Sequence, residues 1–251
     1  MEFGILAIRT ADEDDGRLYP LPGEEKGSIQ MEQWDGEPLR LTGSALTVQE
    51  LRSGQWRTLQ RLRDVKLDVL VTDSRLIVSC SKFDKGGGWI GFGGGGVLFA
   101  MAANGVSKAR AVHRRHGKAL VGQVRYAWLR CVGYKPKAGW GSKEEIRLGV
   151  VVMSGGGDRQ ELFLDIALPN NVDSAAVARA TVKRAASYRL SYTEIEERDR
   201  TLLEELADAP SVGAPEPKKF ALLNIPRHDY VSAAGAYPQQ ETMLASGGEQ
   251  A

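Results

Sequence analysis

Acidic residues are missing from the middle of this 251-residue chain, since none lies between Asp84 and Glu144. The 59 residues of this acid-free window (85–143) contain eleven lysines and arginines. Because the whole chain has a net charge of +1, the rest of it carries a charge of −10. This separation indicates an anionic partner for the window, docking of the window onto the chain's own acidic parts, or a solvated basic face.

Cysteine is nearly absent as well. Cys80 and Cys131 are too few for a disulfide framework, and both lie on expected strands, where cysteine usually serves as a small core side chain. The first residues show no charged-then-apolar leader pattern, so we expect a cytoplasmic protein. The composition, 42% hydrophobic and 26% charged, excludes collagen-like, wholly disordered and multi-span membrane classes.

Groups of catalytic or metal-binding residues are lacking too. His113 and His116 are three apart on an expected basic helix, but they adjoin arginines and no carboxylate, so we predict no metal site. Glu161 and Asp165 share one face of an expected strand at about 13 Å, too far for two carboxylates to act on one bond. We therefore expect a solvated outer face there, no cofactor, no catalytic residue, and a binding protein rather than an enzyme.

Short runs within 38–168, on either side of 86–118, show the period-two alternation that is typical of strands. The clearest pair is 65–72 and 75–80, whose alternating apolar residues flank a Thr72-Asp73-Ser74 turn. A second hairpin is expected at 145–153 and 160–168. The remaining expected strands are 3–9, 39–41, 45–48, 56–62 and 120–134.

The period changes to about 3.6 residues in the next part of the chain. The pattern predicts a helix that is capped by Asp173 or Asn171 and ends near Leu190. A second helix is expected to begin with a Thr193…Glu196 capping box and to end near residue 207.

Composition divides the chain into four parts. An N-terminal strand and acidic linker (1–37) precede one α+β domain (38–190), an accessory helix (191–207) and a mostly disordered tail (208–251). An apolar island at 220–226 interrupts the tail. It is either a short motif that docks on the domain or on a partner, or a chance apolar stretch.

One hairpin carries a likeness to a known family. The residues Val69-Leu-Val-Thr-Asp-Ser-Arg-Leu-Ile-Val78, followed by late strands and a helix from 173, resemble the pleckstrin-homology-like superfamily, in particular its GRAM-type and bacterial members. The resemblance covers about 38–190 and implies a small antiparallel β-barrel or two-sheet sandwich capped by a C-terminal helix. It also implies binding of phospholipid head groups or peptides rather than catalysis.

The chain departs from that family pattern by an insertion at 86–118. Its first part, 86–106, contains no charge and nine glycines, and its second part, 107–118, contains five bases and two histidines. Glycine disfavours helix, and the run leaves about half of the roughly 20 apolar residues that a spanning helix needs. We therefore do not expect the insertion to cross a membrane as one helix.

Four interpretations of the insertion stay open. It enters a membrane interface, where Trp and Phe lie at head-group depth and bases meet anionic lipid. It cradles a phosphate with Gly91-x-Gly93-x-x-Gly96, a match that four consecutive glycines make nearly automatic. It binds nucleic acid through interleaved aromatic and basic residues. Alternatively, its glycines let 97–106 pack closely against another helix or another copy of the chain.

We therefore expect a non-enzymatic binding or scaffold module that engages an anionic surface, either phospholipid head groups or an acidic protein. Residues expected to make apolar or interface contacts are Trp89, Phe92, Val97, Leu98 and Phe99. Residues expected to bind lipid or another anion are Lys108, Arg110, Arg114, Arg115 and Lys118. Such a module is cytoplasmic and peripheral at the inner face of the plasma membrane, and it is compatible with homo-oligomers formed through 86–106. The alternative is a nucleotide- or nucleic-acid-binding protein that uses the glycine run and the acid-free window.

Overall fold

The computed structural model describes residues 29–80, 120–139, 141–153, 159–191, 195–211, 215–216 and 219–226. Its strands are β1 (Leu39–Arg52), β2 (Gln55–Val71), β3 (Arg75–Cys80), β4 (Leu120–Arg125), β5 (Leu129–Lys135), β6 (Glu144–Met153), β7 (Arg159–Leu168) and β8 (Ala221–Asn224). Its helices are the short 3₁₀ turn η1 (Tyr126–Trp128) and the α-helices α2 (Ser174–Leu190) and α3 (Glu197–Asp208).

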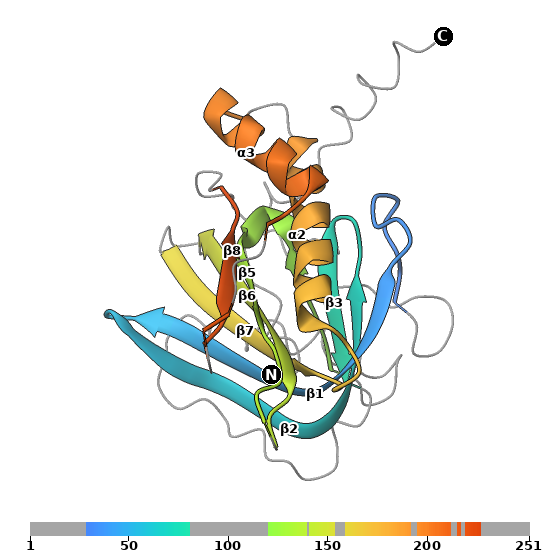
Figure 1. Cartoon of the computed structure of the whole chain (residues 1–251), viewed down its shortest axis with the longest axis vertical. Helices are drawn as coiled ribbons and strands as arrows, with labels where there is room; N and C mark the ends of the chain where they lie inside the picture. The colour runs from blue at the N-terminus through green and yellow to red at the C-terminus, as the bar shows by residue number, and fades with distance from the viewer. Residues whose placement is uncertain are drawn as a thin grey trace, which may run out of the picture.

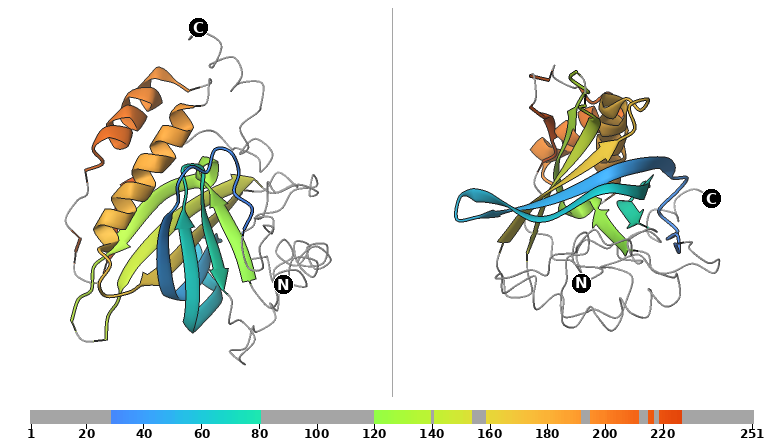
Figure 2. Two further views of the ribbon diagram at one scale, coloured as in Figure 1. Left: turned by 90° about the vertical axis from the view of Figure 1, so that its right-hand side faces the viewer. Right: turned by 90° about the horizontal axis from the view of Figure 1, so that it is seen from below.

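All eight strands form one antiparallel sheet in the order β4-β3-β2-β1-β7-β6-β5-β8. The sheet curls into a half-barrel, and α2 lies over its concave side with α3 packed on α2 (Figures 1 and 2). The expected class, α+β with a barrel-like sheet, is confirmed at this level. Among the described residues, no helix is long and apolar enough to cross a membrane.

The two predicted hairpins are confirmed. β2 and β3 pair from Leu67↔Cys80 to Val71↔Leu76, and β6 and β7 pair up to Met153↔Arg159. The first strands are longer than the alternation predicted, because β1 and β2 each continue across irregular registers. At one of them Asp64 adopts a φ of 54°, so the ladder runs on although the apolar alternation is interrupted.

The prediction of one strand over 120–134 is wrong. η1 divides this segment, and β4 and β5 lie at positions one and seven of the eight-stranded sheet. Tyr126 and Trp128 lie on this turn, and both are buried. A sharp turn between two apolar runs carries no glycine or proline here, so the alternation alone does not reveal it.

The core fills the space between the concave side of the sheet and α2. Val177, Val182 and Ala185 of α2 are buried against inward-facing strand residues such as Ile146 and Leu148. Asp173 caps α2, as one of the two expected residues, by accepting a hydrogen bond from the Ala175 amide at 2.9 Å. The helix therefore begins where its sequence allows the first amides to be satisfied.

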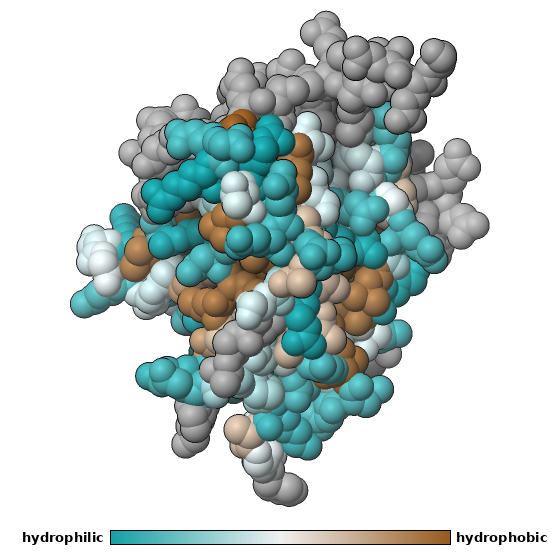
Figure 3. All heavy atoms as spheres, turned by 45° about the horizontal axis from the view of Figure 1, so that its top comes forward, coloured by the Kyte–Doolittle hydropathy of each residue, from teal (hydrophilic) through white to brown (hydrophobic). Residues whose placement is uncertain are grey.

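α3 begins later than predicted. Its N-cap is Glu196, whose side chain makes no capping hydrogen bond, so the expected cap at Thr193 is wrong. On the face that carries α2, α3 and β8, hydrophobic residues gather in the middle and hydrophilic residues surround them (Figure 3). Leu202 of α3 and Leu222 of β8 are among the large hydrophobic side chains that remain exposed.

Candidate functional site

The insertion lies outside the described residues, but the strands that precede and follow it are described. Cys80 at the end of β3 and Leu120 at the start of β4 are directly paired in the ladder. The chain between them, residues 81–119, therefore leaves and re-enters the sheet at neighbouring positions. All ten site residues that the sequence predicted lie in this segment: Trp89, Phe92, Val97, Leu98, Phe99, Lys108, Arg110, Arg114, Arg115 and Lys118.

The N-terminal half of β2 presents a basic surface beside these ends. β3 pairs with β2 only from Leu67 onward, so among the described residues no strand covers this side of Gln55–Lys66. Four exposed bases lie on this half and are called the β2 stripe below: Arg57, Arg61, Arg63 and Lys66. They follow about 30 Å of strand at about 3.3 Å per residue. The stripe ends one residue before the Leu67↔Cys80 pair, where the insertion begins.

The side chains of the β2 stripe make no hydrogen bond or ion pair with the residues that the structure describes. Nine other described bases lie within 4.0 Å of a carboxylate: Arg75, Arg125, Arg130, Lys135, Arg147, Arg179, Arg184, Arg200 and Lys219. Three of these, Arg125, Arg130 and Lys135, belong to the acid-free window. Contacts with the chain's own acids thus account for three of the five described bases of that window, and they do not account for the β2 stripe.

An aromatic side chain lies at the N-terminal end of the β2 stripe. Trp56 is 40% exposed, and its ring stacks on Phe163 of β7 with 4.0 Å between the ring centroids. It follows the tight β1–β2 turn, where Ser53 and Gly54 both have positive φ, and this hairpin end projects from the sheet (Figure 2). The arrangement places one indole face and several guanidinium groups on the same projecting hairpin.

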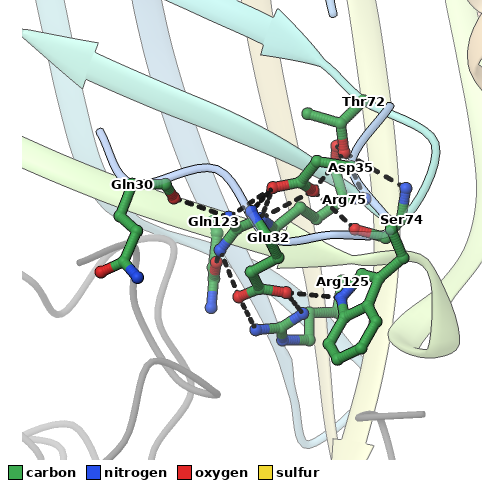
Figure 4. Close-up of polar contacts among 9 residues, drawn as sticks. Gln30, Glu32, Asp35, Thr72, Ser74, Arg75, Gln123 and Arg125 are labelled. Carbon is green, nitrogen blue, oxygen red and sulfur yellow. Dashed lines mark hydrogen bonds and ion pairs between the residues drawn. The ribbon is translucent and has the colours of Figure 1, made fainter. Parts of the chain in front are cut away.

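A buried charge network holds the opposite end of the β3–β4 pair (Figure 4). Asp35, which is fully buried, accepts hydrogen bonds from Arg75 Nη2 at 2.6 Å and from the hydroxyls of Thr72 and Ser74 at 2.8 and 2.7 Å. Burial by itself raises the pKa of Asp35, but hydrogen bonds and charge from Arg75, with the Ser74 hydroxyl, outweigh it and leave that pKa below its ordinary value. The carboxylate is therefore ionised at neutral pH.

A second acid completes this network. Glu32 lies within 2.8 Å of both Arg75 Nη1 and Arg125 Nη2, and it accepts a hydrogen bond from the indole of Trp34. Gln123 of β4 accepts a hydrogen bond from Arg75 Nη1 at 2.6 Å. Two acids and two arginines thus compensate each other, and the segment before β1 is held against β3 and β4. We assign the network a structural role, because its charged groups already satisfy one another.

Sequence reasoning missed this network. Asp35 falls in a segment that composition describes as an acidic linker, yet its carboxylate is 0% exposed. The available signal was the Thr72-Asp73-Ser74-Arg75 run, whose arginine directly follows a turn and requires an anion when it is buried. Nothing local in the sequence shows that residues 32 and 35 supply that anion.

The outer face of β5–β7 carries the carboxylates that were considered for catalysis. Glu161 pairs with Arg130 at 2.9 Å, and Asp165 pairs with Arg147 through two hydrogen bonds of 2.7 and 2.8 Å. The two carboxylates thus face away from the core as expected, but the prediction that they are solvated is wrong, because arginines cover them and leave Glu161 17% and Asp165 15% exposed. Burial is the main reason why the pKa of the Cys131 thiol is raised, so this cysteine is a poor nucleophile.

No group of three or more metal-ligating side chains exists among the described residues. Comparison with known protein families, with curated proteins and with solved structures finds no match for the chain. The candidate site is accordingly defined by charge and geometry: the β2 stripe, Trp56, and the ladder pair from which the basic insertion leaves.

Proposed function

We propose that this chain is a PH-like, non-enzymatic binding module that engages an anionic phospholipid surface through the insertion at 86–118 together with the β2 stripe. The PH-like part of the proposal is supported by the strand order. A four-stranded meander is followed by a three-stranded one and a helix, which fits the small antiparallel barrel with a C-terminal capping helix that the resemblance implies.

The observation that carries the proposal is the β2 stripe, because its side chains have no acid partner among the described residues, whereas nine other described bases lie within 4.0 Å of a carboxylate. Residues 81–119, which lie between Cys80 and Leu120 and include the insertion, add seven bases and one acid immediately after the stripe ends. Each Lys or Arg near an anionic membrane contributes about 1 kcal/mol, and the contribution decreases with salt. The stripe and this segment together carry eleven such residues, a number that supports reversible binding at ordinary ionic strength.

A lipid surface is favoured over an acidic protein by the uncharged run 86–106 and by Trp56. Trp side chains prefer the membrane–water interface, where one part of the ring meets acyl chains and another meets water. A bilayer accommodates an apolar segment and a basic stripe at the same time. The bound protein would be peripheral, at a membrane leaflet rich in anionic lipid.

Co-sedimentation with vesicles tests this function. The full chain is expected to bind phosphatidylserine-containing vesicles and not phosphatidylcholine vesicles, and deletion of 86–118 is expected to weaken binding. Loss of binding at high salt supports an electrostatic surface, whereas binding that survives high salt indicates apolar entry of 86–106. Absence of binding to either vesicle contradicts the proposal, and binding to RNA or DNA instead would support the nucleic-acid alternative.

A further inference from the structure

The apolar island at 220–226 forms the edge of the sheet. Its β8 residues pair with β5 at four positions, from Tyr134↔Ala221 to Cys131↔Asn224. The Ile225 amide donates to the Arg130 carbonyl at 2.7 Å and extends the ladder by one residue. Of the two interpretations that the sequence left open, docking on the domain is therefore confirmed.

Individual side chains of this segment contact different parts of the domain. Leu223 and Ile225 enter the main core and are buried. The Phe220 ring lies 4.1 Å from the Arg147 guanidinium and 4.9 Å from Lys135 Nζ, both of them cation–π contacts. The segment is thus held at three positions, of which Leu223 and Ile225 share the face that meets the core.

Two features of the domain fit a strand at this edge. A Cβ on Gly133 would lie 2.7 Å from Leu222 Cδ2 and 3.3 Å from Arg147 Cβ, so glycine at 133 leaves room for the docked strand. Arg189 at the end of α2 donates hydrogen bonds to the Pro226 carbonyl and to the Leu129 carbonyl, and so connects the segment to η1 and β5. We call this set of contacts on β5, β6 and α2 the β5 groove.

The docked segment is joined to the rest of the domain by a tether. Twelve residues, 209–220, separate α3 from β8, and they include Pro210, Pro215 and Pro217. Fully extended, such a tether reaches about 40 Å. β8 pairs with one strand only, so it can leave the sheet without opening another ladder.

We propose that the β5 groove is a strand-docking site whose resident, residues 219–226, is exchangeable, so that the same segment of a second copy of this chain can occupy it. A second copy presents identical contacts, and exchange of an identical tethered element is a low-cost route to a dimer. Main-chain pairing supplies affinity, and the positions of Phe220, Leu223 and Ile225 supply specificity. This inference is independent of lipid binding, because it uses a different edge of the sheet.

The test uses the full chain and a labelled peptide of residues 219–226. In the wild type, the tethered segment competes at an effective concentration near the millimolar range, so the peptide binds weakly. A full chain with Leu223→Asp has an emptied groove and is expected to bind the peptide at least about 100-fold more tightly. The matched control is Asn224→Asp, since Asn224 is an exposed residue of the same strand, and it is expected to behave as the wild type does.

A peptide that itself carries Leu223→Asp is expected to bind none of the three chains. Equal binding of the unmodified peptide to all three chains, or to none of them, overturns the proposal. If the Leu223→Asp chain does not fold, a protease site placed in the tether at 212–214 of the wild type gives a second test. After cleavage, the released 215–251 fragment is expected to dissociate on dilution and to be replaced by the labelled peptide; a fragment that never exchanges contradicts the inference.

Discussion

Arg75 and Asp35 are forty residues apart in the sequence, and their side chains form a buried ion pair with 2.6 Å between Nη2 and Oδ2. Their exposed fractions are 1% and 0%, so the pair is shielded from water. It joins the segment before β1 to the start of β3, directly after the turn that was recognised in the sequence. A buried pair of this kind stabilises little by itself, but the loss of one partner leaves an uncompensated charge.

We predict that Asp35→Asn lowers the free energy of unfolding by about 3 kcal/mol at pH 7, because Arg75 then loses its buried carboxylate while Glu32 retains one contact. Urea denaturation measures this. The control is Glu37→Ala, an exposed acid two residues away, which is expected to change stability by less than about 0.5 kcal/mol. Equal effects of the two substitutions would contradict the assigned role of the pair.

The same pair predicts a pH dependence. The pKa of Asp35 is lowered in the folded state, so its stabilising contribution is fully present above its unfolded value near 3.8 and is lost as pH falls through the folded pKa. The difference in unfolding free energy between wild type and Asp35→Asn is therefore expected to be constant from pH 5 to 7 and to shrink at lower pH. A difference that grows on acidification would show that the carboxyl is not ionised.

Substitution of two glycines with positive φ distinguishes the cost of backbone strain from the cost of a steric clash. Gly36 and Gly54 have φ values of 59° and 75°, but only at Gly36 would a Cβ meet a neighbour, Asp73 Oδ2 at 2.0 Å. Gly54→Ala is expected to cost about 1 kcal/mol of strain, and Gly36→Ala clearly more, because Asp73 must leave its contact with Arg184. The excess is expected to disappear in the Gly36→Ala, Asp73→Ala double variant; an unchanged excess would assign it to the backbone.

Arg189 connects η1 to the end of the β8 segment. Its guanidinium donates to the carbonyls of Tyr126, Ala127 and Leu129, and to that of Pro226. Arg189→Met is expected to lower the free energy of unfolding by at least about 2 kcal/mol and to speed amide exchange at Leu223 and Ile225. Arg179→Met, on the exposed side of the same helix, serves as control and is expected to change neither quantity.

The sequence predicts those elements whose signals are local. The turn at 72–74 and the cap at Asp173 depend on neighbouring residues, and both are found where expected. The break at 126–128 and the anion that faces Arg75 depend on contacts between distant segments, which periodicity does not contain. The β2 stripe was missed for a similar reason: Arg61 and Arg63 look like an ordinary solvated strand face until the register shows that β3 ends before it reaches them.

Charge reversal on the β2 stripe tests the central claim most directly. Full chains carrying Arg61→Glu with Arg63→Glu, or Arg114→Glu with Arg115→Glu, are compared with the wild type in co-sedimentation with phosphatidylserine vesicles. Reversal of Arg179 and Arg198, which are exposed on α2 and α3, gives a control with the same change in net charge. We predict that each of the first two pairs of substitutions weakens binding at least 30-fold, because each lost base contributes about 1 kcal/mol. Melting temperatures are expected to stay within a few degrees of the wild type. The control pair is expected to bind as the wild type does. Equal weakening by all three pairs, or none by the β2 stripe pair, would contradict an anionic-surface site on this side of the sheet.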